Sequence, residues 1–93
     1  MAKRVKSSGN VFSDMGFTKP AARNLKIRSA LMIQIEKYIK NHQLTQTQAA
    51  TRLGIDQPRL NKLLKGRIDL FTIDRLITML ANIDIDVKLE IAA

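Results

Sequence analysis

The stretch TQTQAATRLGIDQPRLNKLLKG, residues 45–66, decides the fold of this chain. It opens with the pattern T-x-x-Q, a capping box in which the side chains of Thr45 and Gln48 each accept a backbone N–H. Gly54 provides the left-handed backbone that ends a helix. Asp56 is then placed to cap a second helix. The stretch therefore predicts two short helices joined by a tight turn.

The predicted pair has the spacing of a helix-turn-helix, in which a glycine-containing turn of three or four residues joins two short helices. Ala50 is small where the helices approach, and Ile55 fills the corner after Gly54. Leu60 and Leu63 bury one side of the second helix. The competing interpretation is an ordinary helical pair with a solvated charged face. Against it, the second helix itself contains no Asp or Glu after its capping residue.

The distribution of charge favours an anionic partner for the first two-thirds of the chain. The chain has 93 residues, with 16 Lys and Arg against 8 Asp and Glu, a net charge of +8 and a pI near 10.3. Residues 1–67 hold 14 basic and 3 acidic residues, whereas residues 68–93 hold 2 basic and 5 acidic. Such an excess suits nucleic acid, an anionic membrane or an acidic protein.

Composition also limits the class of protein. A chain of 93 residues predicts one domain, and 45% hydrophobic residues is ordinary for a globular protein. The absence of cysteine excludes disulfides and thiolate metal sites and fits a reducing cytosol. The chain opens without an apolar secretory stretch and has no apolar run of about 18 residues or more. We therefore expect a cytoplasmic protein with no metal, no cofactor and no membrane partner.

Two further helices are predicted around residues 45–66. The first covers about residues 20–41, with Pro20 in its first turn. Its apolar stripe is formed by Leu31, Ile35, Tyr38 and Ile39. The second follows a cap at Thr72. Its apolar face is formed by Ile73, Leu76, Ile77 and Leu80.

The period changes to two in IDIDVKLEI, residues 83–91, where apolar and charged residues alternate. This alternation predicts a β-strand with one apolar face. A lone strand has unpaired backbone groups and needs a partner. The expected partner is the same strand of a second chain, and residues 10–12 of the same chain are the alternative. The residues expected at the dimer interface are Ile83, Ile85, Val87, Leu89 and Ile91.

The chain is expected to begin with a flexible basic arm, MAKRVKSSG, residues 1–9. The next segment, NVFSDMGFT, is too short for an independent element but carries an apolar cluster of Val11, Phe12, Met15 and Phe17. Either this cluster packs on the domain's own helices, or it binds a partner protein. The expected organisation is an N-terminal arm with an apolar cluster, a DNA-binding domain and a dimerisation strand, over residues 1–18, 19–82 and 83–93.

The second helix of the pair has a side suited to the major groove of DNA. At about 100° per residue, its leucines share one side and its polar residues lie opposite or on the flank. Gln can hydrogen-bond adenine, and Lys can hydrogen-bond guanine. The residues expected to face bases are Gln57, Pro58, Asn61 and Lys62. Those expected to bind phosphates are Gln46, near a helix N-terminus, and Arg59, Lys65 and Arg67.

Residues 45–66 resemble the helix-turn-helix of the XRE family, the group that includes phage repressors and Cro. The resemblance rests on L-T-Q at 44–46, L-G-I at 53–55 and K-G at 65–66. It implies a mainly α, lambda-repressor-like helical bundle that binds DNA operators as a dimer. The predicted C-terminal strand would be added to that bundle.

The resemblance also implies roles for individual residues. By position, Gln46 would touch backbone phosphate. The residues that would face bases are Gln57, Pro58 and Lys62. The serine that usually caps the recognition helix in this family is Asp56 here. Asp56 keeps the capping function but places a negative charge near DNA.

A narrower resemblance covers nearly the whole chain. SGNVFSDMGF at 8–17, the long helix, IDQPR at 55–59 and the alternating C-terminal segment are similar to small XRE antitoxins of the HigA type. Those antitoxins usually pair with RelE-like, HigB-like ribonuclease toxins. The resemblance implies that the chain neutralises such a toxin and represses its own operon.

Other functions are less consistent with the sequence. No enzyme is expected, because His42 is the only histidine and sits at a predicted helix C-terminus, and no Gly-rich phosphate loop occurs. A stand-alone XRE or phage-type regulator without a toxin remains an alternative. A sequence-neutral nucleic-acid-binding protein is a second alternative. Aromatic residues make up only 4% of the chain, whereas coating proteins usually stack bases on aromatics.

Overall fold

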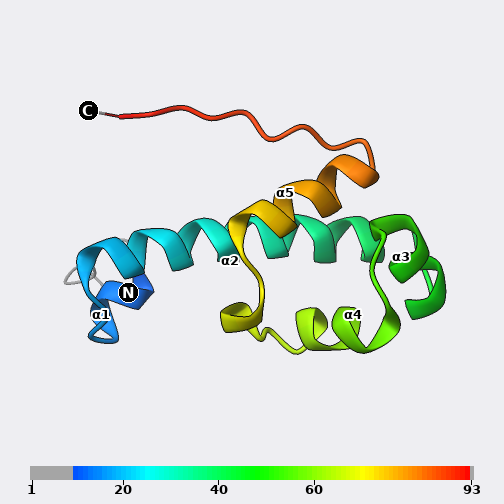
Figure 1. Ribbon diagram of the computed structural model, residues 1–93, viewed down its shortest axis with the longest axis horizontal. Coiled ribbons are helices and arrows are strands. Elements are labelled where there is room, and N and C mark those ends of the chain that lie inside the picture. The colour runs from blue at the N-terminus through cyan, green and yellow to red at the C-terminus, as the bar shows by residue number, and fades with distance from the viewer. Residues whose placement is uncertain (1–9, 93) are drawn as a thin grey trace.

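The computed structural model describes residues 10–92, which form a bundle of helices around the long helix α2 (Figure 1). The elements are α1 (Val11–Asp14), α2 (Lys19–Asn41), α3 (Gln46–Leu53), α4 (Gln57–Leu64), the 3-10 helix η2 (Ile68–Leu70) and α5 (Ile73–Asn82). The helices predicted from the sequence are confirmed as α2 to α5. The expected arm, residues 1–9, lies outside the described residues. Within residues 10–92 no helix has both the length and the apolar character to cross a bilayer.

The helices begin at capping side chains. The capping box predicted at the start of α3 is confirmed, because Gln48 N–H donates to Thr45 Oγ1 at 3.1 Å and Thr45 N–H donates to Gln48 Oε1 at 2.9 Å. Asp56 caps α4 by accepting from Arg59 N–H at 2.8 Å. Thr72 likewise caps α5. These caps fix the first turn of α3, α4 and α5.

The ends of α3 and α5 share a backbone motif. Gly54 follows α3 with φ +76°, and Ile55 N–H donates back to Ala50 O at 3.0 Å. Asp84 follows α5 with φ +61°, and Ile85 N–H donates back to Leu80 O at 2.9 Å. Both are Schellman endings, in which a left-handed residue reverses the chain. A glycine at position 54 predicts the ending of α3, whereas Asp84 does not predict the ending of α5.

The core lies between α2, α3, α4 and α5. Its largest fully buried side chains are Phe71, Ile35, Leu53, Leu60, Leu63, Leu76 and Leu80. Asn82, at the end of α5, donates from Nδ2 to Leu53 O at 2.9 Å. A Cβ at Gly54 would come within 2.8 Å of this amide, so the turn between α3 and α4 packs directly against the end of α5.

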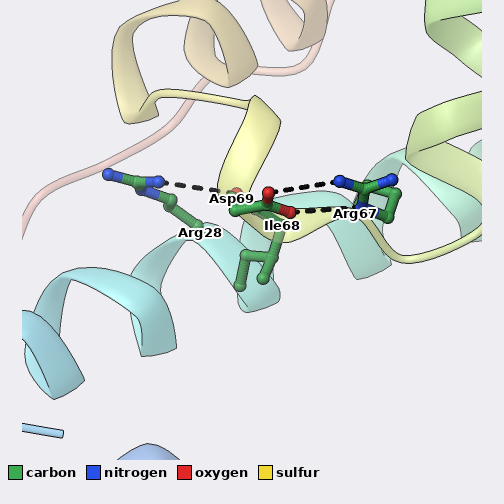
Figure 2. A network of polar contacts seen from close by, with 4 residues as sticks. All are labelled: Arg28, Arg67, Ile68 and Asp69. Atoms are coloured by element: carbon green, nitrogen blue, oxygen red, sulfur yellow. Dashed lines mark hydrogen bonds and ion pairs between the residues drawn. The ribbon is translucent and has the colours of Figure 1, made fainter.

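The 3-10 helix η2 connects α4 to α5 and is attached to α2 (Figure 2). Arg28 of α2 donates from Nη1 to Ile68 O at 3.4 Å. On the other side of η2, Arg67 forms an ion pair with Asp69 at 3.4 Å. The hydrogen bond from Arg28 holds the segment after α4 against α2.

The predicted β-strand over residues 83–91 is not formed: the structure has no strand in residues 10–92. The physical reason is that a strand needs a backbone partner, and the alternative partner in the same chain, residues 10–12, is occupied by α1 and its cap. After Asp84 the tail runs back along the molecule (Figure 1). Its apolar residues divide into two groups. Ile83, Ile85 and Val87 pack on the core, whereas Leu89 and Ile91 are 80% and 89% exposed.

The N-terminal apolar cluster packs against α2 only in part. Asn10 Nδ2 donates to Ala22 O at 3.0 Å, and the rings of Phe12 and Phe17 meet edge to face with centroids 6.2 Å apart. Ala22 is fully buried. Three of the four side chains of the cluster remain exposed to solvent. These are Val11, Met15 and Phe17, which are 59%, 67% and 47% exposed.

Candidate nucleic-acid interface

The helix α4 separates a buried side from an exposed polar side. Leu60 and Leu63 are fully buried in the core. The four residues predicted to face bases are all exposed, and Lys65 at the end of α4 is exposed with them. Those four are Gln57, Pro58, Asn61 and Lys62. The helix therefore offers to solvent a basic and amide-bearing surface with no acidic side chain between Gln57 and Lys65.

The first turn of α3 adjoins the start of α4. Gln46, predicted to bind phosphate, is the exposed first residue of α3. The next residue, Thr47, accepts a hydrogen bond from Gln57 Nε2 at 2.8 Å. The N-termini of α3 and α4 therefore lie together. Helix N-termini carry free N–H groups and a partial positive charge, both of which favour phosphate.

Arg59 differs from the other predicted phosphate ligands. Its side chain is half-buried, and its guanidinium lies over the ring of Phe71 with Cζ 5.4 Å from the centroid. Its Nε is buried and has no hydrogen-bond partner among residues 10–92. The structure thus places Arg59 beside the core aromatic ring, whereas Lys65 extends into solvent.

Arg67 has a partner within the chain. Its guanidinium faces the Asp69 carboxylate, and both side chains are more than half exposed, at 55% and 63%. The hydrogen bond from Arg67 lowers the pKa of the Asp69 carboxyl. An exposed pair of this kind contributes little to stability. A phosphate bound by Arg67 would compete with Asp69.

Sequence reasoning missed Thr47 as a neighbour of Gln57. The two residues are ten positions apart, and only the geometry of the turn between α3 and α4 brings them together. His42 is at the C-terminus of α2, where its Nδ1 lies 2.9 Å from Tyr38 O and its ring stacks on Tyr38. Among residues 10–92, no three His, Asp or Glu side chains come together as metal ligands.

Comparisons with known proteins agree with this geometry. The family model described as a helix-turn-helix domain matches residues 11–92. A solved structure, provisionally named an XRE family transcriptional regulator, is 32% identical, with a TM-score of 0.74. The similarity covers 80% of this chain and 83% of that one. No curated protein matches the chain.

The matched region includes every described helix, from α1 to α5. The chain therefore belongs to the helix-turn-helix domain family and has the fold of an XRE-type regulator.

Proposed function

We propose that the protein is a sequence-specific transcriptional repressor that binds double-stranded DNA through α4. The observation that carries this proposal is the exposed side of α4, where amide and ammonium groups stand on a rigid helix. The core leucines of the same helix fix the direction of these groups. A rigid helix with polar side chains on its outer side is the element that reads base edges in the major groove. The regulator that this chain resembles supports the same function.

Selection from a random double-stranded DNA library tests this function. We expect the full-length protein to enrich a defined site and to bind it at least about 10³-fold more tightly than random DNA at physiological salt. A sequence-neutral coating protein would enrich no site. In that case the charge of the chain, and not the shape of α4, would explain its DNA binding.

We further propose that the protein is the antitoxin of a type II toxin–antitoxin pair, which neutralises a RelE-like toxin. The apolar cluster supports a protein partner, because Val11, Met15 and Phe17 stay largely exposed although their segment is folded. On α2, Ile33 lines a hollow together with Phe12 and is 45% exposed. Exposed apolar patches mark interaction sites. Figure 1 places α1 and α3 at opposite ends of α2, so that toxin and DNA could be bound together.

Replacing Val11 and Met15 together with Ser should weaken binding of the toxin encoded beside this gene by at least about 30-fold, the loss typical of interface hot spots. Both side chains are exposed in the free protein, so the free energy of unfolding should change by no more than about 0.5 kcal/mol. The measurements are calorimetric binding of the toxin and thermal unfolding.

The matched control is Leu89→Ser, which removes from the tail an apolar side chain that is 80% exposed. It should leave toxin binding unchanged. Full neutralisation by the Val11→Ser/Met15→Ser variant would show that the cluster is not the toxin site. Absence of any toxin-sized neighbouring gene would favour a stand-alone regulator.

We also propose that the protein is a homodimer whose tails pair as strands. Ile85 and Val87 cover the chain's own core, whereas Leu89 and Ile91 have no cover within residues 10–92. A second tail would cover these side chains and would pair the backbone of both segments. Two copies of α4 would then bind the two half-sites of one operator.

Replacing Leu89 and Ile91 together with Lys should convert the dimer into a monomer, because lysines on an edge oppose strand pairing. These positions are preferable to truncation after Asn82, since truncation would also remove Ile83, Ile85 and Val87 from the core. Sedimentation of both proteins at equal concentration measures the effect.

The control for this variant is Ile27→Lys, which adds a lysine at an exposed apolar site on α2. It should remain dimeric. If the Leu89→Lys/Ile91→Lys variant sediments as the unchanged protein does, the tails do not form the interface.

A further inference from the structure

We infer that Thr47 is a specificity-determining positioning residue, which holds the Gln57 amide in the orientation that reads adenine. The inference rests on the proposed function. Gln57 is the first residue of α4, and Thr47 is the second residue of α3. The two side chains are exposed, yet they are joined by a hydrogen bond of 2.8 Å from Gln57 Nε2 to Thr47 Oγ1.

The chemistry of the primary amide makes this contact informative. A glutamine amide has two N–H donors and one carbonyl acceptor. Thr47 uses one N–H, so that the second N–H and the carbonyl remain free. Adenine presents an acceptor, N7, beside a donor, the N6 amino group, in the major groove. The free half of the Gln57 amide matches this pair.

Ordering is the second effect of Thr47. An unattached glutamine side chain at the tip of α4 samples many rotamers and both orientations of its amide, and binding a base would have to fix them. The bond to Thr47 selects one arrangement before DNA arrives, and such preorganisation improves affinity for the matching base. The capping box at Thr45 and Gln48 in turn fixes the backbone on both sides of Thr47.

The contact has little value as a stabilising bond. Both side chains are exposed to water, and each can hydrogen-bond water when the other is absent. Removing the Thr47 hydroxyl should therefore leave the melting temperature almost unchanged. A role in base selection and a role in stability thus predict different results for the same variant.

The test begins with Gln57→Ala, which identifies the base pair of the selected operator that Gln57 reads. Thr47→Val should then lower the preference for A·T at that base pair by about fivefold, the value of one hydrogen bond. Affinity for random DNA should change by less than about twofold. Thr47→Ser should keep the full preference, because it retains the hydroxyl. In the Gln57→Ala background, Thr47→Val should have no further effect on base preference.

Thr51→Val is the matched control. It removes another exposed threonine hydroxyl from α3, one that donates only to the backbone at Thr47 O. It should leave base preference intact. Full discrimination by Thr47→Val, or equal losses in Thr47→Val and Thr47→Ser, would overturn the inference while the proposed DNA-binding function stands. A wild-type protein that selects no DNA site would overturn both.

Discussion

Replacing Phe71 with Ala should lower the free energy of unfolding by about 3–5 kcal/mol, the range for truncating a buried Phe. Phe71 is fully buried between η2 and α5 and is among the largest side chains of the core. Its loss would leave a cavity and would remove the ring on which the Arg59 guanidinium lies. Domains of this size have a total stability of about 5–15 kcal/mol, so that this loss would be a large fraction of the total.

The control is Phe17→Ala, which makes the same chemical change at a side chain that is 47% exposed. Phe17 touches the ring of Phe12 but is outside the core, and we expect a loss of no more than about 1 kcal/mol. Urea unfolding of the three proteins compares them. Equal losses at both positions would mean that Phe71 is not a central part of the core.

The sequence allowed the helices of the DNA-binding half to be predicted because their signals are local. The capping box at Thr45, the glycine at 54 and the cap at Asp56 each act within one helical turn, and each is found in the structure. The buried leucines of α4 follow from the same helical period. The exposed positions of the candidate base-reading residues follow as well.

The ends of the chain were harder to predict because their structure depends on contacts distant in sequence. The alternation of residues 83–91 is real, and Ile83, Ile85 and Val87 do turn toward the core. A strand nevertheless requires a second backbone, which one chain does not provide here. Likewise, α1 depends on Asn10 reaching Ala22, a contact that no local period encodes.

Within the candidate site, sequence predicted which side of α4 is exposed but not how neighbouring side chains use their polar groups. Arg59 and Lys65 look equivalent as basic residues of one helix, yet only Arg59 lies over Phe71. Arg67 is paired with Asp69, two residues along the chain. Helical geometry gives the direction of a side chain, whereas its partners depend on the packing of the whole bundle.

Changing Gln57 or Lys62 to Ala should cost about 1–3 kcal/mol in binding of the selected operator, the value of a good base contact. Both residues are on the exposed side of α4. Random DNA offers phosphates but no matching bases, so that Gln57→Ala should leave its affinity nearly unchanged. Lys62→Ala removes a positive charge and should therefore also weaken the binding of random DNA somewhat. Titrations against operator and random duplexes at one salt concentration give these values.

Lys65→Ala is the informative comparison, because Lys65 is exposed at the end of α4, where a phosphate contact is expected. It should weaken binding to all DNA sequences alike. It should also reduce the slope of log K against log salt concentration by about one unit. Arg67→Ala should act in the same direction, but less strongly, because Arg67 must first leave Asp69. A base-reading residue thus changes the ratio of operator to random binding, whereas a phosphate ligand changes both affinities together. Equal losses of Gln57→Ala on operator and random DNA would therefore remove Gln57 from the base-reading set, whatever the absolute affinities are.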